Sequence, residues 1–273
     1  MFNYFKEIKN YYKEDKNKKS TLVIYILLRF LVILSMILQI IRGNWNDVFL
    51  CVLTLVLFTI PYLVNKKLHI SLPSTLEGII LIFIFSAEIL GEIQNFYGIF
   101  QHWDTMLHTI NGFLCAAIGF SLIDILNRSE KLPFNLSPIF VALVAFCFSM
   151  TVGVLWEFFE YGCDIFIRTD MQKDKIVSSI STVALNPEGK NVPVKIDNIN
   201  KTVIYSYDSN GNLVEHVVDS GYLDIGIHDT MKDLFVNFIG AIVFSLIGLL
   251  YIKNRDEYKF AERFIPVVKD DVF

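Results

Sequence analysis

Six stretches of the chain are long and apolar enough to cross a membrane, and they constrain the fold more than any other feature. A transmembrane helix needs about 20 predominantly apolar residues, because its backbone must be hydrogen-bonded without water. The 273 residues are 53% hydrophobic with a mean hydropathy of +0.48, which is too apolar for an ordinary water-soluble domain. The six runs are 22–41, 48–64, 72–90, 105–123, 134–156 and 234–252. The sequence therefore predicts an all-α polytopic membrane protein with six transmembrane helices.

Lysine and arginine in the short loops and tails indicate how these runs are oriented, because such charges resist translocation. With six spans, four basic segments fall on the same side of the membrane, whereas the loop 91–103 has no Lys or Arg. The basic segments are the tail 1–21, the loop with Lys66 and Lys67, the loop with Arg128 and Lys131, and the tail 253–273. We therefore expect both termini to be cytoplasmic.

The one clearly water-soluble part is the segment 165–228, between the fifth and sixth runs. Its stretches 192–196, 203–207 and 213–218 are rich in β-branched and aromatic residues, and Asn210-Gly211 is a strong hairpin-turn signal. The sequence predicts a small extracytoplasmic β insert that serves as a cap, a lid or a partner-docking surface. The predicted organisation is a cytoplasmic basic tail (1–21), transmembrane helices 1–5 (22–164), the insert (165–228), transmembrane helix 6 (229–252) and a cytoplasmic tail (253–273).

Charge and cysteine content exclude several classes of function. A formal net charge of −4 argues against a nucleic-acid partner, which needs a concentrated basic surface. The four cysteines include no CxxC pair, so neither a disulfide framework nor a zinc-thiolate site is indicated. The sequence also lacks a G-x-S-x-G nucleophile elbow and an H-E-x-x-H motif, so a hydrolase of this sequence would have to be metal-driven.

Ionisable residues at the ends of three apolar runs form the main candidate site, because such side chains are costly at membrane depth unless paired, hydrated or metal-bound. Helical neighbours three or four apart share a face, so each pair can point to the same place. The orientation derived from Lys and Arg puts all three pairs at the outer membrane face. The pairs are Asp104 with His108, Glu157 with Glu160, and Asp229 with Asp233.

A divalent metal would compensate this concentration of carboxylates directly. Carboxylate oxygen and imidazole nitrogen suit Zn, Mn or Fe, and a larger carboxylate share suits Mg. All six residues are therefore predicted metal ligands, with His108, Glu157 and Glu160 also assigned catalytic roles. Protonation of the carboxylates is the other route.

Simpler interpretations remain open for part of the set. Asp104 and Asp229 are equally compatible with capping helix N-termini, where a negative charge is favoured. His108 alone is compatible with a hydrogen-bonded core histidine. Capping does not explain Glu157 and Glu160, because they follow a charge-free run and a helix C-terminus disfavours anions.

Three sequence motifs contain the acidic pairs. They are WDTMLH at 103–108 with Gly112, WEFFEY at 156–161, and DTMKD at 229–233 with Gly240-Ala241. In this order they resemble the YjdF-like bacterial inner-membrane proteins over roughly the second half of the chain. A more distant similarity, to VanZ-like membrane proteins, lies in D-x3-H, a paired acid and D-x3-N-x2-G, the last being Asp233, Asn237 and Gly240. The resemblance implies a bacterial plasma-membrane protein and supports the site rather than a particular reaction.

The favoured hypothesis is a metal-dependent membrane enzyme that acts at the outer leaflet on a lipid or lipid-linked envelope substrate. The first alternative is a cation- or proton-coupled transporter. The predicted position of the site argues against it, because the site lies at one end of the bundle rather than at the midplane. The second is a structural or regulatory envelope protein whose polar cluster is an internal network, against which the outer side has no obvious basic counterpart apart from Lys232 and Arg168. Membrane lipids are the expected partners, and the oligomeric state stays open.

Overall fold

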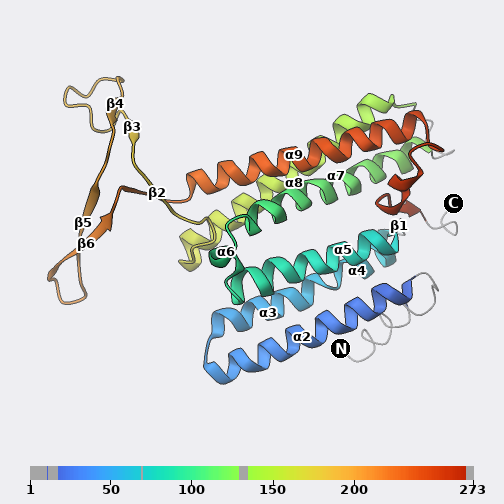
Figure 1. Ribbon diagram of the computed structural model, residues 1–273, viewed down its shortest axis with the longest axis horizontal. Coiled ribbons are helices and arrows are strands. Elements are labelled where there is room, and N and C mark those ends of the chain that lie inside the picture. The colour runs from blue at the N-terminus through green and yellow to red at the C-terminus, as the bar shows by residue number, and fades with distance from the viewer. Residues whose placement is uncertain (1–10, 12–17, 69, 129–134, 269–273) are drawn as a thin grey trace. The chain divides into compact units, whose positions relative to one another are not determined.

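The computed structural model describes residue 11 and residues 18–68, 70–128 and 135–268 (Figure 1). The chain divides into two compact units. The first comprises Met1–Val154 and Asp233–Phe273, and the second Leu155–Lys232. Helices α8 and α9 each run from one unit into the other.

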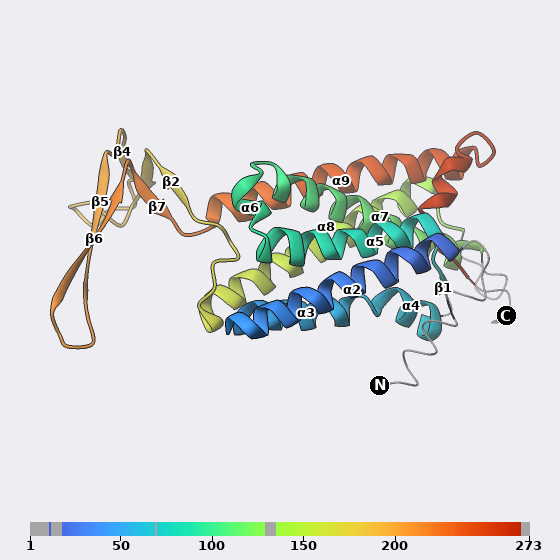
Figure 2. The same ribbon diagram turned by 60° about the horizontal axis from the view of Figure 1, so that its bottom comes forward.

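The first unit is helical, and its long helices run alongside one another in both views (Figures 1 and 2). Strands β1 (Ile70–Ser71) and β8 (Val267–Val268) pair antiparallel at one end of it. The helices are α2 (Lys19–Arg42), α3 (Trp45–Leu57), α4 (Ile60–Leu68), α5 (Ser74–Phe85), the π-helix η2 (Ser86–Ile93), α6 (Phe96–Ile99), α7 (Trp103–Arg128), α8 (Pro138–Ile167), α9 (Ile227–Lys253) and the 3-10 helix η3 (Lys259–Arg263).

Five helices in the described part of the chain are long and apolar enough to cross a membrane, and each coincides with most or all of one of the six predicted runs. Four are α2, α8, α9 and Trp103–Asn127 of α7; the other, Trp45–Lys67, combines α3 and most of α4. The predicted run 72–90 differs, because α5 passes directly into the π-helix η2. A π-helix has wider i→i+5 turns, so this run is not one uniform helix. The six-span count therefore stays a prediction.

Two buried apolar clusters hold the helices of the first unit together. One joins α2, α3 and α5 through residues such as Tyr25, Val32 and Leu81. The other joins α7, α8 and α9 and includes several side chains with no exposed surface. Small residues at this second contact let the helix backbones approach closely. The fully buried members are Ala116, Ala117, Phe120, Val141, Ala145, Ala241, Phe244 and Ala261.

Glycines bring α7 and α9 into backbone contact. A Cβ atom on Gly240 would lie 2.0 Å from the carbonyl oxygen of Thr109, and one on Gly112 would lie 2.1 Å from that of Asn237. Only glycine fits at both positions. The hydroxyl of Ser149 on α8 donates to the Gly112 carbonyl at 2.7 Å, which ties the third helix to the same crossing.

Buried acids and basic side chains gather at the end of the first unit where α2 begins and α7 ends. Glu77 accepts from the Lys18 ammonium at 2.9 Å, and both side chains are buried. Asp124, at the end of α7, accepts from Arg255 at 3.0 Å. These two ion pairs define what we call the basic end, and α3 and α7 begin at the opposite end (Figure 2).

The second unit contains three antiparallel strand pairs between the C-terminal part of α8 and the start of α9. The predicted strands are confirmed as β4 (Val194–Ile196), β5 (Lys201–Tyr207) and β6 (Leu213–Asp219). β5 and β6 form the predicted hairpin, in which Gly211 has a φ of 81°. Three short strands were not predicted: β2 (Lys175–Val177), β3 (Ile180–Thr182) and β7 (Tyr222–Asp224). β2 pairs with β7 and β3 with β4.

α8 begins at Pro138, later than the apolar run 134–156, and continues past that run to Ile167, three residues beyond the expected end of the helical region at residue 164. The chain then turns back on the carboxylate of Asp164, which accepts from the backbone N–H groups of Met171 at 2.7 Å and Gln172 at 2.9 Å. The apolar run and the helix differ because hydropathy marks where a helix is apolar rather than where its hydrogen bonds begin and stop.

Candidate metal centre

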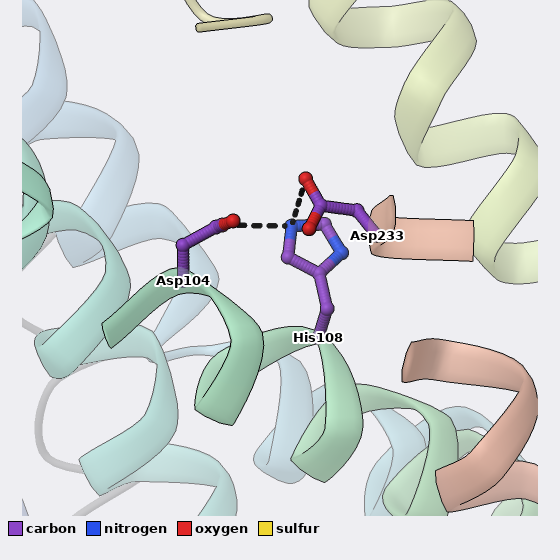
Figure 3. Close-up of side chains that lie close together, drawn as sticks. All are labelled: Asp104, His108 and Asp233. Carbon is purple, nitrogen blue, oxygen red and sulfur yellow. Dashed lines mark ion pairs between the residues drawn. The ribbon is translucent and has the colours of Figure 1, made fainter. Parts of the chain in front are cut away.

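Asp104, His108 and Asp233 come together where α7 and α9 pack against each other (Figure 3). The Nε2 atom of His108 lies 3.3 Å from Oδ1 of Asp104, one turn earlier on α7. The same nitrogen lies 3.8 Å from Oδ2 of Asp233 on α9. One donor atom from each residue lies within 4.8 Å of the other two, so the three converge on one point.

The three side chains differ in depth. The side chain of Asp233 is 2% exposed, that of His108 12% and that of Asp104 22%. The cluster is therefore closed on the α9 side and more open at the beginning of α7. Its depth follows from the glycine crossing, because Gly112 lies one turn beyond His108 and Asn237 one turn beyond Asp233.

Trp103 holds the beginning of α7, immediately before Asp104. Its indole N–H donates to the carbonyl of Ser86 at 3.2 Å, and its ring makes an edge contact with Phe96 at a centroid distance of 4.9 Å. Ser86 is the first residue of the π-helix η2, so this hydrogen bond connects η2 to the beginning of α7, next to Asp104.

The donor atoms fit a divalent cation in type and in spacing. Two oxygen atoms and one imidazole nitrogen are ordinary ligands for zinc, manganese or iron. Ligands about 2.0–2.1 Å from a tetrahedral ion lie roughly 3.3 Å apart. The observed 3.3 and 3.8 Å are close to that value, so small side-chain movements would complete the site. A protonated His108 between two carboxylates is the alternative state of the same geometry.

The other three predicted ligands belong to the second unit, where Asp229 has basic neighbours. Its carboxylate accepts from the backbone N–H of Lys173 at 3.0 Å and lies 3.7 Å from the Lys175 ammonium and 3.6 Å from that of Lys232. These contacts give the Asp229 carboxylate basic partners, and its ligand role stays a prediction.

Glu157 and Glu160 lie one turn apart on α8 and both are buried. Glu160 accepts from the indole N–H of Trp156 at 2.8 Å, one turn earlier on α8. The ligand and catalytic roles of the two glutamates stay predictions.

Sequence reasoning missed the polar contacts one turn deeper than the cluster. The Asn111 amide donates to Asn237 Oδ1 at 3.2 Å, and Asn237 reaches the Ser149 carbonyl at 3.5 Å. The spacing of Asn111, three residues after His108, places it on the same helix face and was the signal available. With Ser149, these residues keep α7, α8 and α9 in one register.

Comparison with known proteins places the chain among membrane proteins. A family profile described as "Predicted membrane protein (DUF2238)" matches residues 21–254. A protein of Thermotoga maritima, described as uncharacterized, is 29% identical over 104 residues, which are 38% of this chain. The chain spans about half the length of that relative, 52%. No solved structure matches. The YjdF-like resemblance is consistent with this result, and the VanZ-like one stays a prediction.

Proposed function

Since the chain belongs to the DUF2238 family of predicted membrane proteins, we propose that it binds a divalent cation through Asp104, His108 and Asp233. The observation that carries this proposal is the convergence of three donor atoms from two helices on one point. The trio is net negative whether or not the imidazole is protonated, so a dication also balances its charge. Two of the residues lie 125 positions or more from the third in sequence, and the glycine crossing supports their approach.

We further propose that the cation serves catalysis on a lipid or lipid-linked envelope substrate. Three protein ligands leave coordination positions open, as in catalytic metal sites. A bound dication would act as a Lewis acid and make a water molecule more acidic. Asp104, His108 and Asp233 would orient this ion. The partial exposure of Asp104 supports access from outside the helix bundle.

The proposed orientation follows from the basic end. Lys18, Lys66, Lys67 and Arg255 belong to the ends of elements that the lysine and arginine pattern assigns to the cytoplasm. The cluster would then face the outside of a bacterial plasma membrane, with both termini in the cytoplasm. A sixth span formed by α5 and η2 completes this arrangement. α5 has 12 residues and η2 the next 8, and about 20 residues are enough to cross a membrane.

Transport is the weaker alternative. A transported cation or proton needs a polar route from the cluster to the basic end. Between Asn237 and the Asp124–Arg255 pair, the contact of α7 and α9 contains Ala117, Phe120 and Phe244, each without exposed surface. The same stretches also bury Ser121, whose hydroxyl donates to the Ala117 carbonyl, and Ser245. The large side chains of this layer are apolar, which favours a site that binds and reacts at one end of the bundle.

The test of the metal site is elemental mass spectrometry on detergent-purified protein. We expect one equivalent of metal in the wild type and its loss in His108→Ala and Asp233→Asn. Asp229→Asn is the matched control, since it removes a carboxylate one turn earlier on α9 that lies against lysines. Folded wild-type protein that takes up no zinc, manganese, iron or magnesium would refute the site.

The catalytic step needs a separate test. Wild type and His108→Ala are reconstituted in vesicles of phosphatidylethanolamine and phosphatidylglycerol, and lipid products are followed by mass spectrometry with and without a chelator. We expect chelator-sensitive products from the wild type alone. Metal binding without turnover of these lipids would move the search to lipid-linked glycans.

A further inference from the structure

The β5–β6 hairpin of the second unit has unused pairing capacity. The two strands pair only with each other among the described residues, which include the whole of Leu155–Lys232. Each strand is seven residues long. A lone two-stranded hairpin is marginally stable in water, and a long free edge invites a further strand.

The hairpin also exposes large apolar side chains. The register pairs Tyr207 with Leu213 and Val203 with Val217, so these residues share one face with Tyr205 and with its cross-strand partner Glu215. Exposed fractions reach 60% for Tyr205 and 76% for Tyr207. Exposed large apolar side chains gathered on one face are typical of interaction surfaces.

The two edges of the hairpin differ in charge. β6 carries the acids Glu215 and Asp219, and charged residues protect an edge from pairing. β5 has the sequence KTVIYSY, with one charged residue at its first position and β-branched or aromatic residues at its centre. The β5 edge is therefore the one suited to accept another strand.

We propose that two copies of this chain dimerise by antiparallel pairing of β5 with β5, centred on Ile204. All seven residues pair in this register. Val203 lies opposite Tyr205 of the partner subunit, a β-branched and aromatic pair that stabilises sheets. Lys201 lies opposite Tyr207 of the partner subunit, which brings an ammonium to an aromatic ring.

The resulting sheet has the strand order β6-β5-β5-β6 and a two-fold axis at Ile204. Such an isologous interface closes on itself, and two-fold dimers are the commonest oligomers. Pairing of β6 with β6 is disfavoured, because the same symmetric register brings the two Glu215 side chains into diagonal contact on one face. This dimer does not depend on the metal site.

Disulfide cross-linking in membranes tests the register. Ile204→Cys places one thiol from each copy beside the axis, and we expect an oxidant to convert most of it to a covalent dimer. His216→Cys is the matched control, because His216 is the cross-strand partner of Ile204 and occupies the same position on β6. Wild type, with its four cysteines, gives the background. Equal cross-linking of both variants, or none of Ile204→Cys, would overturn the proposal.

The mass of the purified protein in detergent gives a second readout. We expect a dimer for wild type and His216→Lys, and a monomer for Ile204→Lys, which sets two ammonium groups against each other at the axis. A monomeric wild type overturns the proposal. A monomeric wild type together with a cross-link of Ile204→Cys to a different protein in membranes would mean that another protein occupies the β5 edge, and this also overturns it. A dimer unaffected by Ile204→Lys does so as well.

Discussion

The acidic side chains at the two ends of the helical unit have different partners. At the basic end, Glu77 lies 2.9 Å from the ammonium of Lys18 and also accepts from the hydroxyl of Tyr11 at 3.4 Å. At the other end, Asp104 and Asp233 share the imidazole of His108 at 3.3 and 3.8 Å. One end pairs a carboxylate with an ammonium group, whereas the other gathers two carboxylates around one imidazole.

This difference indicates that the acid at the basic end stabilises the fold, whereas the acids at the other end form the candidate site. A buried ion pair costs desolvation energy and, once formed, holds its two elements together. Lys18 and Glu77 join the beginning of α2 to the beginning of α5 in this way. The carboxylate cluster around one histidine instead offers three converging donor atoms, and this is where we propose that a cation binds.

The largest expected effect comes from removing one acid at each end. Glu77→Gln leaves a buried ammonium without its carboxylate, so we expect a loss of about 3–5 kcal/mol in the free energy of unfolding. Asp104→Asn in the presence of a chelator should leave stability unchanged or slightly raised, because it relieves repulsion with Asp233. Denaturant titration in micelles measures both. Equal losses would erase the distinction between the two ends.

A bound dication should act on one end alone. Zinc or manganese added at 100 times its dissociation constant should stabilise chelator-stripped wild type by about 2.7 kcal/mol. His108→Ala should show no such gain, and Glu77→Gln should keep the full increment despite its lower starting stability. The melting temperature with and without metal provides the measurement. A gain retained by His108→Ala would place the ion elsewhere.

A smaller effect is expected from Trp103, which positions Asp104 without belonging to the cluster. Trp103→Phe loses the hydrogen bond to the Ser86 carbonyl, at a cost of about 1 kcal/mol. We expect weaker metal binding together with retained stoichiometry, as measured by competition with a chromophoric chelator. Trp45→Phe is the control, since Trp45 is 69% exposed. Unaltered metal affinity in Trp103→Phe would show that the hydrogen bond from Trp103 to η2 does not position Asp104 for metal binding.

The smallest effect is expected for acids outside the membrane-spanning helices, because these acids are more exposed to solvent than those at the two ends of the helical unit. Partial burial, followed by the carboxylates of Asp170, Asp224 and Asp164, raises the pKa of Asp174. A raised pKa means that the stability present below the unfolded-state pKa is lost as the pH rises through the folded-state value. Asp174→Asn should therefore slow amide hydrogen exchange in β2 at neutral pH and have little effect in acid.

Asp208 provides the control of opposite sign in the same unit. Hydrogen bonds, first from the backbone of Asn212, lower the pKa of Asp208. Its contribution is present above the unfolded-state pKa and is lost as the pH falls through the folded-state value. Asp208→Asn should speed exchange at the β5–β6 turn at neutral pH. The same direction of change in both variants would contradict this interpretation.

Much of the fold could be predicted because it is encoded in local periodicity. The apolar run 22–41 became α2, and the Asn210-Gly211 signal marked the hairpin of β5 and β6. The break between α5 and η2 could not be predicted, because nothing in the apolar pattern distinguishes a π turn from an α turn. The short strands β2 and β7 were also missed, since each depends on a partner about 45 residues away, as in the pair Ile176 and Leu223.

For the site, the sequence by itself determined the i,i+4 pair of Asp104 and His108, and it predicted a common membrane face for the acidic helix ends. Only the tertiary structure decided that Asp233 reaches His108 whereas Asp229 lies against lysines. These two acids have the same spacing pattern and the same helix, so local pattern cannot separate them. The contact of Asn111 with Asn237, 126 residues apart, shows the reason. Helix period sets which face a residue occupies, but close packing between distant helices sets what that face meets.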